Sequence, residues 1–482
     1  MTMNPRHFAL ACLGLSLLGL PLARAAEDEK TTTLKDQRQV ALTIYNQDLA
    51  LIKDSRTVNL GQGDNALAWR DVSARIRPET ALLRNPTQQE GFRLIEQNFD
   101  FDLLTPQKLL EKYVGRKLRV IKTAPNTGIE TSEEATLLSA NGGAVLQFAD
   151  RIESHPPGRL AYKALPDNLR DRPTLVIRLE TTNAGQQDLE LSYLTGGLSW
   201  KADYVGELSA DDTRLDLNGW VTLTNQSGTR YPNARLQLVA GDVNRVRDDM
   251  QRREMKAMPM MAAAPAPYMQ EESLFDYHLY TLDRPTTIAD NQTKQVALLA
   301  APQVPARKEY RLQGADYYYR DAQNDLGQKL RVAVFVEFDN KGRSLSLPLP
   351  KGTVRIYKRD SAGNAQFIGE DRIDHTPKNE TVRLKLGDAF DVTAEKKQTD
   401  FKRIAAASRG SYGVFESAYE VKLKNAKNEA VTIKVVEPVP GDWEVLNESH
   451  PHTKAAANWA TWNVSVPAGG STTLIYRVRT KW

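Results

Sequence analysis

Alternation of apolar and polar residues is the pattern that most constrains how this chain can fold. Residues 40–45 and 431–435 alternate in this way, and residues 331–338 would give an extended strand one wholly apolar face. Turn-forming sequences such as those at residues 340–342 and 468–470 separate the runs. Many short β-branched and aromatic runs at such spacing are typical of sandwiches and barrels. The sequence therefore predicts a mainly β protein with several β-sandwich domains.

One segment carries the signals of an α-helix. Thr105 is a suitable N-cap, Pro106 would occupy the first helical position, and Gly115 would follow the last turn. Short strand-like runs follow Gly115 as far as residue 162. A helix followed by several short strands predicts a small helix-plus-β-barrel insertion at residues 101–162, in the N-terminal half of the chain.

A change in composition divides the rest of the chain. Residues 244–272 are charged and then rich in Met, Ala and Pro, and they have no hydrophobic period. We expect a flexible linker here, because such a segment cannot bury enough apolar surface to order itself. The predicted organisation is a signal peptide at 1–25, an N-terminal β domain at 26–100 that continues at 163–195, the insertion at 101–162, a first sandwich part at 196–243, the linker at 244–272 and the remaining sandwich parts at 273–482.

The first 25 residues have the features of a secretory signal peptide. Arg6 gives a positive start, residues 8–22 form an apolar run, and residues 23–25 form a small-residue cleavage box. We expect the mature protein to begin near Ala26, to be periplasmic or secreted, and to retain no transmembrane helix. The single cysteine, Cys12, would leave with this segment, so the mature protein could form no disulfide.

Charge and motif content argue against two classes of function. The formal net charge of +4 gives no electrostatic case for nucleic-acid binding. The sequence has no G-x-S-x-G elbow, no H-E-x-x-H, no phosphate loop and no dinucleotide fingerprint. The prediction is therefore a protein without enzymatic activity and without a cofactor. An enzyme whose site is assembled only in three dimensions stays an alternative, because sequence cannot pair carboxylates across strands.

Methionine has an unusual distribution. Apart from Met1 and Met3, every methionine lies between residues 250 and 269. Thioethers are soft ligands that suit Cu(I), and they also absorb oxidants. The candidate metal ligands are Met255, Met258, Met260 and Met261. The favoured interpretation is a linker in which Met is a flexible apolar residue, and a copper-holding or oxidant-absorbing protein is the alternative.

Histidine and tryptophan provide weaker candidates. The His-Pro-His sequence at residues 450–452 could offer two imidazoles to a metal, but two ligands do not close a site, and a solvated loop is favoured. His278 is expected to pack or to make a turn hydrogen bond. Trp443, Trp459 and Trp462 could stack on a sugar or a peptide. Trp443 and Trp462 are expected instead to pack in a sandwich core.

The C-terminal residues alternate up to a terminal tryptophan. Leu474, Tyr476, Val478 and Trp482 would share one face of a strand, which resembles the last strand of an outer-membrane β-barrel. A barrel needs regular strands of about ten residues throughout, and the strand-like runs here vary in length. The favoured interpretation is an edge strand of a sandwich, with the membrane barrel as an alternative.

From Tyr193 onward, a series of short motifs resembles a known family. In chain order the motifs are LSWKADY at 198–204, LNGWVTLTNQSG at 217–228, YPNARL at 231–236, HLYTL at 278–282 and PAGG at 467–470. They resemble the C-terminal domain of mucoidy-inhibitor-like proteins, domain of unknown function 4139, over roughly residues 193–482. The resemblance implies a β-rich, Ig-like architecture and no established activity. Familiar members also carry a long coiled coil, whereas residues 56–170 contain no heptad run.

These observations lead to one expected function. Export, sandwich domains and the absence of catalytic motifs predict a non-enzymatic protein of a Gram-negative-type cell envelope that acts as a structural or interaction module. Its expected partners are cell-envelope proteins or surface polymers. Nucleic acid is not expected among them.

Overall fold

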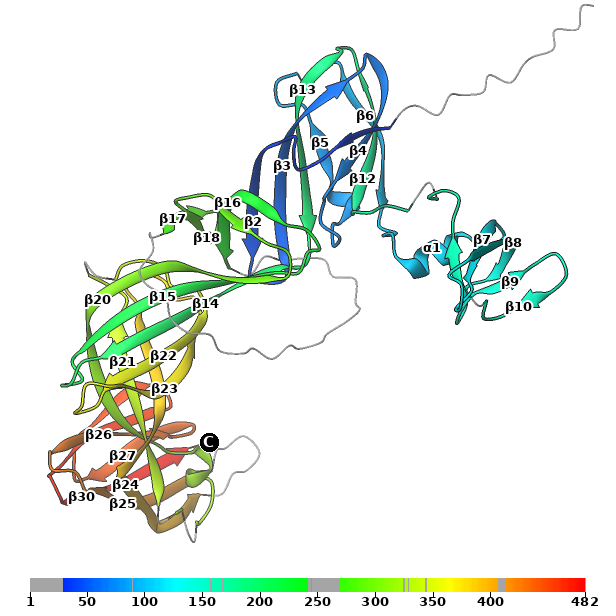
Figure 1. Cartoon of the computed structure of the whole chain (residues 1–482). Coiled ribbons are helices and arrows are strands. Elements are labelled where there is room, and N and C mark those ends of the chain that lie inside the picture. The colour runs from blue at the N-terminus through cyan, green and yellow to red at the C-terminus, as the bar shows by residue number, and fades with distance from the viewer. Residues whose placement is uncertain are drawn as a thin grey trace, which may run out of the picture. The chain divides into compact units, whose positions relative to one another are not determined.

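The structure is a computed structural model that describes residues 29–88, 90–156, 158–166, 169–241, 244, 269–323, 326–327, 329–342, 345–405 and 413–481. Strands make up 65% of it and helices 3%, so the predicted mainly β class is confirmed. The chain divides into two compact units (Figure 1), and each is described by itself. The predicted signal peptide and most of the predicted linker lie outside the described residues.

Unit 1 groups Met1–Gln37, Arg56–Val72 and Leu83–Glu190. Its four-stranded sheet has the order β1-β4-β12-β6. The strands are β1 (Lys30–Thr32), β4 (Gly63–Arg70), β12 (Thr174–Thr181) and β6 (Phe92–Asp100). Arg56 is fully buried beside this sheet, where it donates hydrogen bonds to the carbonyls of Thr32 and Arg70 and stacks 4.7 Å from the Trp69 ring. Those contacts satisfy a charge that would otherwise be costly to bury.

The insertion in unit 1 consists of one helix and a five-stranded antiparallel sheet of order β10-β9-β8-β7-β11. Its elements are α1 (Pro106–Lys112), β7 (Lys117–Thr123), β8 (Glu130–Ser139), β9 (Val145–Gln147), β10 (Ile152–Glu153) and β11 (Arg159–Ala161). The Thr105 hydroxyl accepts a hydrogen bond from the Lys108 amide at 3.1 Å, which confirms the predicted cap. Leu110 and Tyr113 pack into the core of the insertion.

Unit 2 groups Arg38–Ser55, Ser73–Leu82 and Leu191–Trp482. An eight-stranded sheet has the order β17-β18-β16-β2-β3-β13-β5, and β19 pairs with β16; β2, β3, β5 and β13 have residues in both units. The strands are β2 (Gln37–Tyr45), β3 (Leu49–Leu60), β5 (Leu82–Arg84), β13 (Gly185–Thr195), β16 (Tyr231–Ala240), β17 (Met269–Leu274), β18 (Tyr277–Leu282) and β19 (Thr286–Ile288), and a 3-10 turn spans Pro78–Thr80. The parallel pairing of β2 with β16 groups an early segment of the chain with the C-terminal part, which sequence periodicity does not reveal.

Strand β17 begins earlier than the sequence suggests. The predicted linker extends to residue 272, whereas the strand starts at Met269. Met269 pairs with Leu282 and is buried, so one methionine of the Met-rich segment belongs to a sheet. The polar run that follows Met269 lacks the apolar alternation that predicts the other strands.

The largest sheet has thirteen strands on its main path or attached to it. They are β14 (Leu198–Leu208), β15 (Arg214–Asn225), β20 (Gln292–Gln313), β21 (Leu330–Asp339), β22 (Gly352–Arg359), β23 (Ala365–Ile373), β24 (Thr381–Ala405), β25 (Val414–Asn425), β26 (Val431–Pro438), β27 (Asp442–Glu448), β28 (His452–Ala456), β29 (Trp459–Val466) and β30 (Ser471–Lys481), and a 3-10 turn spans Asp316–Tyr319. β20 and β24 are so long that each contributes to two neighbouring bodies of strands (Figure 1).

The first body is a ring of seven strands in the order β23-β22-β14-β15-β20-β21-β24. The last strand returns to the first, because the Lys385 amide donates to the Asp371 carboxylate at 2.7 Å. Gly369 lies so close to the Leu386 carbonyl that a Cβ would stand 2.4 Å from its oxygen. A glycine is therefore required where the two strands touch. We call this body the seven-strand ring.

The second body has two runs of paired strands, β20-β26-β29-β28 and β24-β25-β30-β27, that share one core, and we call it the C-terminal sandwich. Its core is almost entirely apolar or aromatic and includes Tyr419, Trp462 and Tyr476, all less than 2% exposed. Tyr476 stacks between the rings of Tyr419 and Trp462 at centroid distances of 5.1 and 4.6 Å. Offset stacks of this kind fill a core and add to the energy of burial.

Candidate functional site

The candidate site is a cavity of about 320 Å³ at one end of the seven-strand ring. Leu208 is the last residue of β14, Asp212 lies in the turn after it, and Lys358 is next to the end of β22. The cavity is lined by Leu208, Asp212, Lys308, Tyr310, Val334, Val336, Lys358, Ile368, residues 386–391 and Lys427. Pockets of roughly 300–1,000 Å³ with apolar walls and a few polar groups are the usual form of ligand sites.

Strand register brings the walls together. Lys308 pairs with Val336, and Tyr310 pairs with Val334, so alternate residues of β20 and β21 face the cavity. On the other side, Leu208 of β14 lies directly beside Lys358 of β22. Because side chains alternate between the two faces of a strand, the intervening residues point out of the ring. The inner wall is therefore apolar with lysines at its rim.

Asp212 holds two of these lysines. Its carboxylate oxygens lie 2.9 Å from the Lys308 ammonium and 2.5 Å from the Lys358 ammonium. Burial raises the pKa of Asp212, but the hydrogen bonds and charges of the two lysines outweigh it and leave that pKa below its ordinary value. Burial lowers the pKa of Lys308, but the hydrogen bond and charge of Asp212, together with Tyr310, outweigh it and leave that pKa above its ordinary value. Asp212 and Lys308 are therefore both charged at neutral pH.

A bulge in β24 forms the opposite rim. Arg331 of β21 pairs with Thr393, whereas Ala333 pairs with Asp388, so β24 has three more residues than β21 in this interval. Extra residues of this kind leave the ladder and turn their side chains away from it. Phe390 lies in the bulge and is 94% exposed, the most exposed of the large apolar residues that the structure describes. Ile368 of β23 is a second partly exposed apolar residue on the same cavity.

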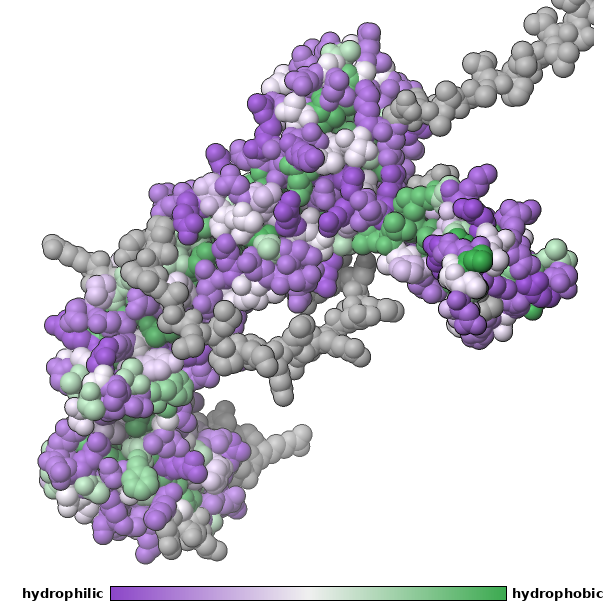
Figure 2. All heavy atoms as spheres, viewed as in Figure 1, coloured by the Kyte–Doolittle hydropathy of each residue, from purple (hydrophilic) through white to green (hydrophobic). Residues whose placement is uncertain are grey.

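Much of the remaining surface is polar. Figure 2 shows hydrophilic residues over most of the visible face, with small separate apolar areas. An almost fully exposed phenylalanine beside a cavity is therefore a local exception. Scattered apolar residues need no explanation, but grouped ones mark binding sites.

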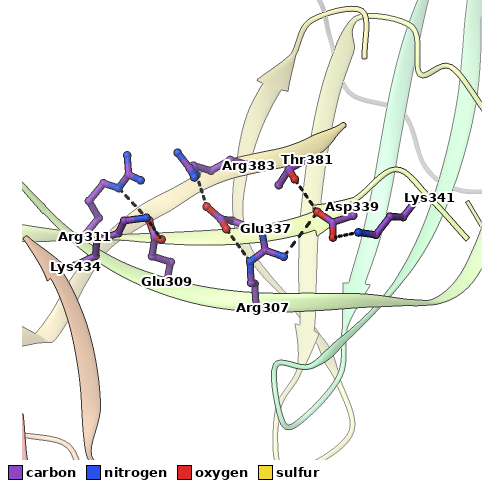
Figure 3. Close-up of polar contacts among 9 residues, drawn as sticks. All are labelled: Arg307, Glu309, Arg311, Glu337, Asp339, Lys341, Thr381, Arg383 and Lys434. Carbon is purple, nitrogen blue, oxygen red and sulfur yellow. Dashed lines mark hydrogen bonds and ion pairs between the residues drawn. The ribbon is translucent and has the colours of Figure 1, made fainter. Parts of the chain in front are cut away.

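The outer face of the same strands carries a row of ion pairs (Figure 3). Glu337 of β21 lies between Arg307 of β20 and Arg383 of β24, its direct neighbours in the register. Arg307 Nε donates to one carboxylate oxygen at 2.9 Å and Arg383 Nε donates to the other. Burial raises the pKa of Glu337, but the two arginines outweigh it and the net pKa is below the ordinary value. These contacts clamp three of the strands that line the cavity on their inner face.

The row extends on both sides of this clamp (Figure 3). Asp339 accepts a hydrogen bond from Thr381 at 2.7 Å and pairs with Lys341 at 3.1 Å. Glu309 binds both Arg311 and Lys434, at 3.0 and 3.2 Å, and so joins β20 to β26. The row therefore fixes the register of neighbouring strands, as cross-strand pairs do.

The Met residues proposed as soft metal ligands, namely Met255, Met258, Met260 and Met261, lie outside the described residues. The two histidines of the His-Pro-His sequence have different partners: the His450 ring lies 2.9 Å from the Ser449 hydroxyl, and His452 lies 2.9 Å from Glu448. Within the described part of the chain, no group of three or more His, Cys, Asp or Glu side chains is placed to hold a metal.

The aromatic candidates are mainly core residues. Trp443 and Trp462 are buried in the C-terminal sandwich, which confirms the expected packing role. Trp459 is only half-buried. His278 lies 2.8 Å from Glu271 across the β17–β18 hairpin, a side-chain contact within one hairpin.

The cavity residues were not found from the sequence. Lys308, Lys358 and Asp212 are far apart in the chain, and only strand pairing brings them together. One signal was present: Leu386-Gly387-Asp388 interrupts a regular alternation in β24 just before Phe390. A glycine followed by an out-of-phase aromatic residue is typical of a bulge.

Comparison with known proteins gives a family. Residues 189–482, more than half of the chain, match the family model described as domain of unknown function, DUF4139. No curated protein matches the chain. Among the described residues, no helix is both long and apolar enough to cross a membrane.

Proposed function

The chain belongs to the DUF4139 family, and we propose that it is a non-enzymatic interaction module of the cell envelope that binds its partner in the cavity of the seven-strand ring. The signal-like residues 1–25 support an exported protein. The cavity combines apolar walls with a few charged groups at its rim, which is how binding sites are commonly built.

One observation carries this proposal: Phe390 is 94% exposed at the rim of a cavity of about 320 Å³. A phenylalanine side chain offers about 150–250 Å² of surface for burial. Leaving it in water costs free energy that a bound partner would recover. Aromatic residues beside a pocket are also enriched among the residues that dominate binding. The bulge therefore presents an anchor next to a preformed apolar site.

A neutral apolar fluorophore tests the cavity directly. N-phenyl-1-naphthylamine should show a saturable rise in fluorescence with the folded, mature protein. Ala389→Phe should abolish the rise, because the added ring would occupy the cavity that Ala389 lines. Ala365→Phe is the matched control, since Ala365 is exposed on β23 and does not line the cavity. Equal fluorescence from both variants would contradict the proposed site.

A photo-crosslinking residue at position 390 tests for an envelope partner in cells. The same residue at position 275 is the control, because Phe275 is similarly exposed, at 85%, but lies on the β17–β18 hairpin. We expect an adduct from position 390 that disappears in the Ala389→Phe background. An adduct unaffected by that change would place the interaction outside the cavity. Fractionation should recover the protein from the periplasm, and deletion of residues 1–25 should retain it in the cytoplasm.

A further inference from the structure

We propose that the cavity takes a single-chain amphipathic anion, an aliphatic chain that ends in a carboxylate or phosphate head group. This inference rests on the proposed function, because it names the class of ligand for the same site. The chain would lie against the inner wall of the seven-strand ring, and the head group would lie at the rim beside the lysines.

The inner wall favours an aliphatic chain. Its apolar members are Leu208, Tyr310, Val334, Val336, Ile368 and Leu386. Leu208, Tyr310 and Val336 are less than 9% exposed, so these side chains are closely packed against their neighbours in the protein. A flexible methylene chain can lie along these apolar side chains, and each methylene that it buries contributes to affinity.

The charges at the rim favour an anionic head group. Lys308 and Lys358 share a single carboxylate, that of Asp212, which leaves one positive charge uncompensated at this end. Three carboxylates and three ammonium groups line the cavity in all. One of the carboxylates, Asp388, also lies 3.4 Å from Arg331, outside the cavity. The third ammonium group, that of Lys427, likewise lies 3.9 Å from Glu429, outside the cavity, so the excess of positive charge is local to the part of the rim formed by Lys308, Lys358 and Asp212.

The positions of Lys308 and Lys358 suit an anionic head group at the rim of the cavity. The side chains of Lys308 and Lys358 are each 29% exposed, so both are largely covered by neighbouring groups and still reach solvent. An ammonium group binds oxyanions as a point charge, without the two-pronged selectivity of a guanidinium. Carboxylate and phosphate heads should consequently both bind. Phe390 lies on the opposite rim, where its ring can cover the part of the chain next to the head group.

Calorimetric titration with probes below their micelle concentrations tests the class of ligand. The probes are octanoate, decanoate, decyl phosphate and decylamine at pH 7.5. We expect decanoate and decyl phosphate to bind, and decylamine to bind at least about tenfold more weakly, because like charges repel at the rim. Each added methylene should raise affinity about fourfold until the cavity is full. If decylamine matches decanoate, the head-group assignment is wrong.

Two substitutions should change anion affinity in opposite directions. Lys358→Met keeps the apolar stem and removes the charge, so decanoate affinity should fall about five- to tenfold. Asp212→Asn removes the competing carboxylate, so decanoate affinity should rise. General damage to the site would lower affinity in both variants. Lys422→Met is the control, because Lys422 is exposed on β25 and does not line the cavity.

The outcomes separate this inference from the proposed function. Binding of the neutral fluorophore without binding of decanoate would overturn the amphipathic anion and leave the cavity as an interaction site. If the unmodified protein gave no saturable rise in fluorescence, both the proposed function and this inference would be overturned. A lower decanoate affinity in Asp212→Asn would overturn the inference even if Lys358→Met failed to fold.

Discussion

The ammonium group of Lys396 lies 2.7 Å from the carboxylate of Glu437, and the two side chains are only 1% and 0% exposed in the core of the C-terminal sandwich. The rings of Tyr318 and Tyr419 lie 4.3 and 4.7 Å from the ammonium group. Tyr319 donates a hydrogen bond to the other carboxylate oxygen at 2.9 Å. A buried pair of this kind is tolerable only because these contacts replace water.

Removing one partner of this pair should cost more than removing both. Lys396→Met leaves a carboxylate uncompensated, and we expect a loss of about 3–5 kcal/mol in the free energy of unfolding. Glu437→Gln should cost a similar amount, and the double variant should cost clearly less than the sum. Urea denaturation measures all three. Arg93→Ala, which breaks an exposed ion pair with Glu180, should cost less than about 1 kcal/mol. Additive losses at Lys396 and Glu437 would contradict the coupling.

The unfolding free energy should fall steeply above pH 10. Burial raises the pKa values of Tyr204, Tyr319 and Tyr476 well above 10.0, and that of Tyr318 to about 12. A group whose pKa is raised on folding contributes stability below its unfolded pKa, and this is lost as the pH rises toward the folded value. Burial lowers the pKa of Lys396, which acts in the opposite direction, but it is a single group.

Absorbance of tyrosinate near 295 nm and urea titrations between pH 8 and pH 12 measure this alkaline loss. The buried tyrosines should ionise only when the protein unfolds, so the two signals should change together. Complete tyrosine ionisation in a protein that remains folded would contradict the prediction.

Glu337→Gln should destabilise the protein at neutral pH and not in acid. The arginines hold the pKa of Glu337 below its ordinary value of 4.5, so its contribution is present above pH 4.5 and disappears as the pH falls through the folded value. At pH 7 we expect a loss of about 1.5–3 kcal/mol, because two bonds to a charged acceptor are weakened. The difference between the variant and the unmodified protein should shrink toward pH 3. Glu370→Gln, an exposed position, is the comparison.

Local patterns in the sequence predicted local structure well. The apolar side of residues 331–338 became the buried side of β21, with Val332, Val336 and Phe338 at most 1% exposed. Thr105 caps α1 as expected. These features depend on residues that are close together in the chain. Local sequence patterns, such as the period of two and the helix-capping residue, can therefore predict them.

The candidate site could not be predicted in the same way. The ring closes because β14 pairs with β22, about 150 residues later in the chain, and because β24 returns to β23. The bulge that exposes Phe390 depends on how β24 aligns with β21, and the register of two strands is not recorded in either sequence alone. Nothing in the residues around Lys308 or Asp212 distinguishes them from solvated charges.

One hydrogen-bond arrangement around an asparagine occurs twice in unit 2, and the sequence pattern does not predict it. Asn225 ends β15, and Asn425 ends β25. Each side-chain amide donates to the carbonyl four residues later and to a second loop, at Ala289 or Pro467. Each side-chain oxygen accepts a hydrogen bond from the amide two residues later. The same local arrangement thus holds a turn and a distant loop at two places in unit 2.

We expect Asn225→Ala and Asn425→Ala to be destabilising to a similar degree. Each change leaves buried or partly buried backbone carbonyls without their donor, at a cost of about 1–3 kcal/mol for each buried group left unsatisfied. Chemical denaturation measures the loss. Asn364→Ala is a suitable control, because Asn364 is an exposed turn residue. A loss confined to one of the two positions would show that the arrangements are not equivalent.

Tyr113→Phe should loosen the insertion without affecting unit 2. The Tyr113 hydroxyl donates to the Ala164 carbonyl at 2.6 Å and accepts from the Ala164 amide at 2.9 Å, so it ties the returning chain to the helix. Removing it leaves two backbone groups unpaired, and we expect faster hydrogen exchange in residues 158–166 and faster tryptic cleavage at Lys163. Tyr162→Phe is the control, because no hydrogen bond of its hydroxyl is present among the described residues, and its ring stays 4.7 Å from Tyr113. Equal exchange in both variants would assign the stability of this junction to ring packing alone.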